Sequence, residues 1–193
     1  MTSTGIDRSE GANALCLLRG INVGGNRKVA MARLRKMFEG LGYTHVRTLI
    51  NSGNVIFRSR ARDAAKLNRR IEKSIEEEFG FPVDVVVLGV DRLEEIVAAI
   101  PDDWVDDQRM RCYVMFLWPE VDAEAVLDEI PSNPDIEDIR YLPGAVVWRI
   151  DRKFVTKSKV TRMVGTDVYK KLSMRSVNTV RKLLALMQPE PSG

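Results

Sequence analysis

Alternating apolar and polar stretches divide the first ninety residues into predicted strands and helices. Residues 14–18 are continuously apolar, which predicts a central strand that is covered on both faces. Apolar residues then recur at helical spacing over 31–41 and at four-residue steps over 61–79. Three β-type runs complete the pattern, at 46–50, 55–57 and 83–88. The predicted order is strand, helix, strand, strand, helix, strand, which is the βαββαβ order of a ferredoxin-like fold.

The second half of the chain repeats part of this pattern. The predicted elements are a helix near 91–100, a strand at 112–118, a short helix near 122–130, and a hairpin of 136–141 with 145–150. Two C-terminal helices follow, the second with Ser176 as its N-cap. We therefore predict an α+β protein with two small ferredoxin-like (βαββαβ-type) subdomains and extra C-terminal helices.

These elements give a predicted division of the chain. The segments are a disordered leader at 1–12, an N-terminal βαββαβ subdomain at 13–90, a second α+β subdomain at 91–155, C-terminal helices at 156–187 that pack on both, and a tail at 188–193. Between the predicted helix and strand of the second subdomain lies an acidic loop, PDDWVDD, in which Trp104 is expected to be exposed.

The composition is that of a soluble globular protein, with 45% hydrophobic and 30% charged residues. No apolar run approaches the roughly 20 residues that a membrane helix needs, and the N-terminus has no apolar signal segment. We therefore expect a cytoplasmic protein. Cys16 and Cys112 both lie in apolar runs, which favours two small buried side chains in a reducing compartment.

The net charge of +3 hides a strong charge pattern along the chain. Residues 1–71 carry a net charge of +10, residues 72–138 carry −16, and residues 139–187 carry +10. Either the segments pair with one another across an internal interface, or the two basic segments converge on one anionic ligand. The charge pattern alone leaves both interpretations open.

The loop at residues 20–28 begins GINVGG, which has the glycine spacing of a phosphate-binding P-loop. Such a loop continues with Lys and then Ser or Thr, whereas here Asn26 and Arg27 follow, so an ATPase is disfavoured. A glycine-rich loop before a helix still offers backbone amides and a positive helix end to an anion. Arg19, Arg27 and Lys28 flank it. The alternative is that the glycines only form a tight turn.

Other kinds of chemistry find little support in the sequence. His45 is the only histidine, which argues against His-dependent triads and the usual zinc sites. An RNA-recognition motif stacks bases on aromatic residues of its first and third strands, yet Phe57 is the only aromatic residue in those predicted strands. We expect no metal, no cofactor and no membrane partner.

Three motifs carry a resemblance to a known family: LLRGINVGGNRKV, NSGNVIF and MRSVNTVRKL. In these motifs the chain resembles a bacterial family that is catalogued as a domain of unknown function, number 1697. The family's terminal pattern usually reads Thr-Arg-Asn-Trp-Asn-Thr, and here Ser176 and Val177 depart from it. The resemblance implies an α+β fold of two small subdomains with C-terminal helices, and it implies no activity. It also implies a polar site at Arg19, Asn22, Gly24, Gly25, Ser52, Gly53, Asn54, Arg175, Asn178 and Thr179.

Our leading hypothesis is a binding protein for a phosphate-bearing ligand, either a nucleotide or a nucleic acid, at the glycine-rich loop. Segments 20–28, 52–54 and 175–179 would meet at one site, where arginines neutralise the ligand and loop amides and Asn side chains orient it. The predicted ligand-binding residues are Arg19, Asn22, Gly24, Gly25, Asn26, Arg27, Lys28, Ser52, Gly53, Asn54, Arg175, Asn178 and Thr179.

Two alternatives belong to other classes of protein. One is a hydrolase or transferase that uses Ser52 or a carboxylate in a cleft between the subdomains. The other is a protein-interaction module whose acidic segment binds a basic partner, with Trp104 as the anchor. The sequence does not fix the oligomeric state.

Overall fold

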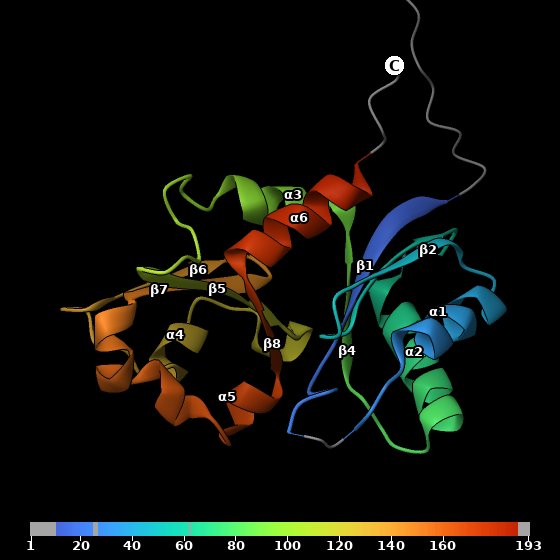
Figure 1. The fold of residues 1–193 in the computed structure, drawn as a ribbon, viewed down its shortest axis with the longest axis horizontal. Coiled ribbons are helices and arrows are strands. Elements are labelled where there is room, and N and C mark those ends of the chain that lie inside the picture. The colour runs from blue at the N-terminus through green and yellow to red at the C-terminus, as the bar shows by residue number, and fades with distance from the viewer. Residues whose placement is uncertain (1–10, 25–26, 62, 189–193) are drawn as a thin grey trace, which may run out of the picture. The chain divides into compact units, whose positions relative to one another are not determined.

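The structure is a computed structural model that describes residues 11–24, 27–61 and 63–188. The chain divides into two units: one comprises residues 1–90 and 186–193, and the other comprises residues 91–185. Each unit contains one four-stranded antiparallel sheet together with helices, so the fold class is α+β (Figure 1).

The first unit is built around strand β1. Its elements are β1 (Ala12–Leu18), α1 (Met31–Gly40), β2 (Thr44–Leu49), β3 (Asn54–Ser59), α2 (Ala64–Phe79) and β4 (Val85–Gly89). The strand order is β2-β3-β1-β4. Leu15 pairs with Ile56 of β3 on one side and with Leu88 of β4 on the other. Leu15, Cys16 and Leu17 are all fully buried, so the prediction of a strand covered on both faces is confirmed.

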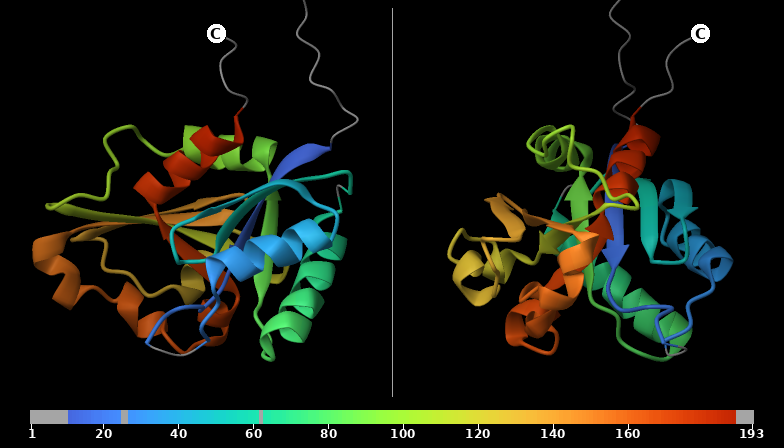
Figure 2. Two further views of the ribbon diagram at one scale, coloured as in Figure 1. Left: turned by 45° about the vertical axis from the view of Figure 1, so that its right-hand side comes forward. Right: turned by 60° about the vertical axis from the view of Figure 1, so that its left-hand side comes forward.

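Helices α1 and α2 cover one face of this sheet (Figures 1 and 2). Leu34 and Phe38 of α1 and Ile71 of α2 are fully buried in the same apolar cluster as Cys16. Helix α2 begins where the side chain of Asp63 accepts a hydrogen bond from the Lys66 amide at 3.0 Å, as an N-cap residue does. The predicted helical stripes therefore form the core of the unit.

The second unit contains more short helices than the first. Its elements are α3 (Val90–Ala98), β5 (Met110–Leu117), η2 (Pro119–Val121), α4 (Val126–Glu129), β6 (Glu137–Leu142), β7 (Ala145–Asp151), η3 (Arg152–Lys157), η4 (Val160–Met163), α5 (Asp167–Lys170), β8 (Leu172–Ser176) and α6 (Val177–Met187). The strand order is β6-β7-β5-β8. Ser176 caps α6 by accepting a hydrogen bond from the Thr179 amide at 3.3 Å, as predicted.

The prediction that 156–187 is helical is wrong in its central part. Strand β8 occupies Leu172–Ser176 and pairs with β5, while short 3-10 turns and α5 replace the predicted helix around Val160 and Val168. The apolar spacing resembled a helix, but Gly165 at φ 93° breaks it. Leu172 then faces Leu117 across the sheet, so pairing with β5 decides its conformation.

The prediction that Trp104 is exposed is also wrong, because its side chain is only 2% exposed. The guanidinium carbon of Arg140 lies 4.7 Å from its ring centroid, and that of Arg149 lies 5.5 Å away. Two cations therefore cover the indole through cation–π contacts. This burial removes the aromatic anchor on which the protein-interaction hypothesis relied.

Part of the sequence lies outside the described residues. The predicted leader falls there except for Gly11 and Ala12, and β1 already begins at Ala12. Of the predicted tail, only Gln188 is described. Within the described ranges, no helix has the length and apolarity to span a bilayer.

Residues 50–53 form the hairpin turn between β2 and β3. Replacement of Gly53 by alanine tests how this turn packs onto β1. An added Cβ would lie 2.7 Å from Leu18 Cβ and 2.8 Å from Ile21 Cδ1, at a φ of +73°. We expect Gly53→Ala to lower the free energy of unfolding by about 2–4 kcal/mol in a urea titration. Gly20→Ala is the matched control, because Gly20 has φ +64° and no atom within 4 Å of its added Cβ. It should cost only about 1–2 kcal/mol, and equal losses would contradict the packing argument.

Candidate functional site

The Asn22 side chain joins the glycine-rich loop to the β2–β3 hairpin turn. Its Oδ1 accepts a hydrogen bond from the Val29 amide at 2.9 Å. Its Nδ2 donates to the Val29 carbonyl at 3.0 Å and to the Asn51 carbonyl at 2.9 Å. The Leu18 amide also donates to the Gly53 carbonyl at 2.8 Å. Two of the three predicted segments, 20–28 and 52–54, therefore lie side by side.

The hairpin turn is held by its own side chains. Asn54 is fully buried, and its Nδ2 donates to the Leu49 carbonyl and to Ser52 Oγ, both at 3.0 Å. These bonds tie the first residue of β3 to the turn and to the end of β2. Asn54 and Ser52, both predicted to bind a ligand, therefore have a structural role in the turn.

Unusual backbone conformations gather at this pair of loops. Among the described residues other than glycine, four have positive φ, and three of them are Asn22, Arg27 and Ile50. The left-handed region is especially unfavourable for a β-branched residue such as Ile50. Such conformations persist only where surrounding contacts impose them, and they cluster at functional sites. Gly25 and Asn26, also predicted site residues, lie outside the described residues.

Several backbone amides near the loop already donate within the fold. Arg19 N donates to the Asp84 carbonyl at 3.0 Å, and Asn22 N donates to the Arg27 carbonyl at 3.2 Å. Together with the amides of Leu18 and Val29, these groups are not available to a ligand. The loop thus offers fewer donors than its glycine content suggests.

The third predicted segment, 175–179, belongs to the second unit. Arg175 is buried, and its Nη1 donates to Ser173 Oγ at 3.0 Å and to the Met174 carbonyl at 2.7 Å. The side chain of Asn178 accepts a hydrogen bond from the Asp106 amide at 3.2 Å and donates one to the Asp106 carbonyl at 2.7 Å. The two bonds of Asn178 hold the start of α6 to the loop before β5. That this segment shares a site with the glycine-rich loop stays a prediction.

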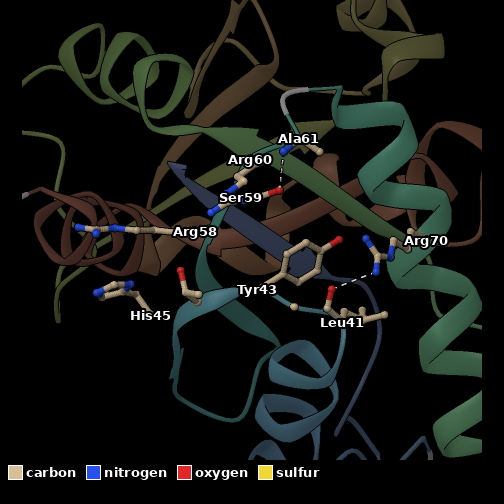
Figure 3. A pocket seen from close by; sticks show the side chains of 10 residues that line it. Leu41, Tyr43, His45, Arg58, Ser59, Arg60, Ala61 and Arg70 are labelled. Carbon is tan, nitrogen blue, oxygen red and sulfur yellow. Dashed lines mark hydrogen bonds between the residues drawn. The ribbon is translucent and has the colours of Figure 1, made fainter. Parts of the chain in front are cut away.

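A pocket of about 620 Å³ lies in the first unit, and the sequence reasoning did not find it (Figure 3). It opens where the segment after α1, the start of β2, the end of β3 and α2 meet. Among the described residues that line it, no side chain is acidic. The polar side chains in its wall are Tyr43, Thr44, His45, Arg58, Ser59, Arg60 and Arg70.

We refer to this pocket as the arginine pocket. It lies at the end of the first unit's sheet that is remote from the glycine-rich loop. Ser59, in the pocket wall, pairs with Ala12 at the start of β1, whereas Asn54 at the start of β3 pairs with Leu17 near the end of β1. The two sites are therefore separated by most of the length of β3. Irregular pairing between Thr44 and Arg47, with His45 at φ 52°, shapes the β2 side of the pocket.

Tyr43 lies in the centre of the arginine pocket. In Figure 3 its ring stands between Arg70 on one side and Arg58 with His45 on the other. Tyr43 is only 6% exposed, and its hydroxyl has no hydrogen-bond partner among the described residues. Burial raises the pKa of this phenol, an effect that the charge of Arg70 partly offsets. The hydroxyl therefore stays protonated at neutral pH as a donor without an acceptor.

Contacts with the protein orient two of the arginines. Arg70 Nη2 donates to the Leu41 carbonyl at 3.0 Å, and its guanidinium carbon lies 5.7 Å from the Tyr43 ring centroid. Arg58 Nε donates to Asn13 Oδ1 at 3.1 Å. The bond from Arg70 to Leu41 uses one of the five N–H donors that a guanidinium carries. Arg58 and Arg60 are two positions apart at the end of a strand, a spacing that could have signalled a shared face.

Fold and pocket together define an α+β protein with two four-stranded antiparallel sheets and an arginine-lined pocket beside the first. The profile of the protein family of unknown function DUF1697 matches residues 12–148, and the chain belongs to that family. The expected membership is therefore confirmed. A conserved bacterial protein from Streptococcus pneumoniae has a similar structure, with a TM-score of 0.79 and 24% identity over 92% of this chain and 99% of that one. A search of curated proteins gives no match.

Replacement of Asn22 by aspartate tests the bond network between the two loops. The change preserves shape and tolerance of positive φ, but it replaces the Nδ2 donor by an oxygen that faces two carbonyls. We expect Asn22→Asp to lower the free energy of unfolding by about 2–3 kcal/mol and to speed hydrogen exchange of the Val29 amide. Asn51→Asp is the control, because residue 51 is exposed and contributes its carbonyl to this network. Unchanged stability of Asn22→Asp would refute a structural role.

Proposed function

We propose that this protein binds a phosphate-bearing ligand and that the arginine pocket of the first unit holds the phosphate. The observation that carries the proposal is the clustering of Arg58, Arg60 and Arg70 around one pocket in which no described lining residue is acidic. A pocket lined by several positive charges, with no carboxylate among its described lining residues, attracts an anion. The planar forks of arginine match the oxygens of phosphate, which favours this anion.

Three further features support phosphate recognition. Tyr43 lines the pocket, and its buried hydroxyl is a neutral donor without a hydrogen-bond partner among the described residues. His45 adds an imidazole N–H donor at the edge of the pocket. The volume of about 620 Å³ falls within the range of roughly 300–1,000 Å³ typical of small-molecule sites.

The pocket suits the phosphate of a nucleotide better than the bases of a nucleic acid. Tyr43 is the only aromatic ring among the described lining residues except for the imidazole of His45, and its face is buried. Phe57, the aromatic residue of β3, is fully buried in the core beside it, with ring centroids 4.6 Å apart. Single-strand binding relies on exposed aromatic platforms, which these residues do not provide.

The glycine-rich loop remains a second location for the same ligand class. The specific observation that favours it is the N-terminus of α1, where Ala30 provides no side-chain cap and the exposed Arg27 and Lys28 lie just before it. Backbone amides of an uncapped first turn attract anions. We therefore treat the loop as the alternative site that the experiment must separate from the pocket.

We also infer a finer description of the fold and the compartment. Each unit arranges its strands in the same way, β4-β1-β3-β2 and β8-β5-β7-β6, which supports two ferredoxin-like subdomains. Cys16 and Cys112 are buried and form no disulfide, and burial raises the pKa of the Cys112 thiol to about 11. Buried cysteines without a disulfide are compatible with a reducing, cytoplasmic location.

Titration of the protein with inorganic pyrophosphate, ADP and a single-stranded oligonucleotide tests the proposal. We expect calorimetry to show pyrophosphate and ADP binding that weakens with added salt. Arg60→Gln and Arg70→Gln should each lower the affinity about 10- to 100-fold, because a charged hydrogen bond contributes about 1.5–3 kcal/mol. Arg69→Gln is the matched control, since residue 69 is an exposed neighbour on α2 outside the pocket wall, and it should change affinity less than about twofold.

The loop is tested in the same way with Arg27→Gln and Lys28→Gln. Loss of affinity in these variants alone would move the site to the glycine-rich loop. Stronger binding of the oligonucleotide than of ADP would favour nucleic acid. No binding of any of the three probes to the folded protein would overturn the proposal.

A further inference from the structure

A second cavity, of about 240 Å³, lies within the second unit and differs in character from the arginine pocket. Strand β5 contributes Arg111 and Tyr113, and β7 contributes Trp148, which pairs directly with Tyr113 across the sheet. Met174 of β8 and residues between 160 and 169 complete the wall. We refer to it as the aromatic cavity.

The walls of the aromatic cavity are mainly apolar and aromatic. The ring centroids of Tyr113 and Trp148 lie 6.2 Å apart, and Tyr169 and Met163 also line the space. Val164, in the cavity wall, is 62% exposed, so a large apolar side chain meets water beside the cavity. Exposed apolar groups beside a cavity favour entry of an apolar ligand.

Two hydrogen-bond donors in this wall lack partners. Trp148 is 3% exposed, yet its indole Nε1 has no acceptor among the described residues. Arg111 Nε is likewise buried and without an acceptor in that part of the chain. A buried donor without a partner costs about 1–3 kcal/mol, so two such donors beside one cavity call for an explanation.

The charge of Arg111 is also uncompensated. No carboxylate in the described part of the chain lies within ion-pair distance of its guanidinium, whose carbon is 5.9 Å from the Tyr113 ring centroid. No described residue in the cavity wall is acidic. A half-buried guanidinium over an aromatic ring is well placed to pair with a carboxylate that enters beside it.

We propose that the aromatic cavity binds a small planar aromatic carboxylate. The ring lies among Tyr113, Trp148 and Tyr169, and the carboxylate pairs with Arg111. This site is independent of the phosphate site in the first unit, and neither proposal requires the other. The volume limits the ligand to roughly one or two fused rings, below the usual size of drug-like sites.

The test uses 2-naphthoate as the probe on the full chain, followed by the indole signals in ¹H–¹⁵N NMR spectra. We expect saturable binding that shifts the Trp148 indole signal and leaves the Trp104 signal in place. The neutral analogue 2-naphthylmethanol should bind at least about tenfold more weakly, which corresponds to about 1.4 kcal/mol. Saturating pyrophosphate should leave the naphthoate titration unchanged.

Arg111→Met retains an apolar stem and removes the charge, and it should lower naphthoate affinity at least about tenfold. Arg109→Met is the matched control, because Arg109 lies two residues away, has an 83% exposed side chain and stays outside the cavity wall. Circular dichroism confirms that both variants fold. Absence of naphthoate binding at millimolar concentration, or equal affinity of the two variants, would overturn the proposal.

Discussion

The position of β1 between β3 and β4 is the constraint on which the first unit depends. The strand is fully buried at Leu15, Cys16 and Leu17, which point alternately to its two faces. Because both faces must therefore be covered, the strand takes a central position between two neighbours. One end of β1 leads into the glycine-rich loop, and the other lies beside the arginine pocket. A single strand thus sets where both candidate anion sites of this unit lie.

The second unit uses the same strand arrangement with different consequences. Strand β5 is central between β7 and β8, and β8 leads directly into the α6 helix through the Ser176 cap. Its core holds Met115 and Trp148, while Arg111 and Tyr113 of β5 line a cavity together with residues of η4 and α5. The shared plan therefore produces a cationic pocket in one unit and an aromatic cavity in the other.

Arginine plays several distinct parts in this chain, and only some of its positions are candidates for ligand binding. Arg140 and Arg149 cover Trp104, and Arg181 donates to the carbonyls of Pro101 and Trp104. These residues tie the acidic loop into the second unit, which supports the interpretation that part of the charge pattern is internal pairing. Arg60 and Arg111 line cavities in which no described lining residue is acidic.

The sequence by itself determined the strands and helices of the first unit, because long apolar runs and regular stripes leave one solution. The sequence also located the glycine-rich loop, but it did not indicate that nearby amides such as that of Arg19 donate to carbonyls of the protein itself. Only the tertiary structure decided that residues 172–176 form a strand, because they pair with β5. It also decided that Trp104 is buried, because two arginines from strands β6 and β7 cover its ring. The arginine pocket likewise exists only after folding, because Arg58 and Arg70 come from a strand and a helix whose meeting depends on sheet register.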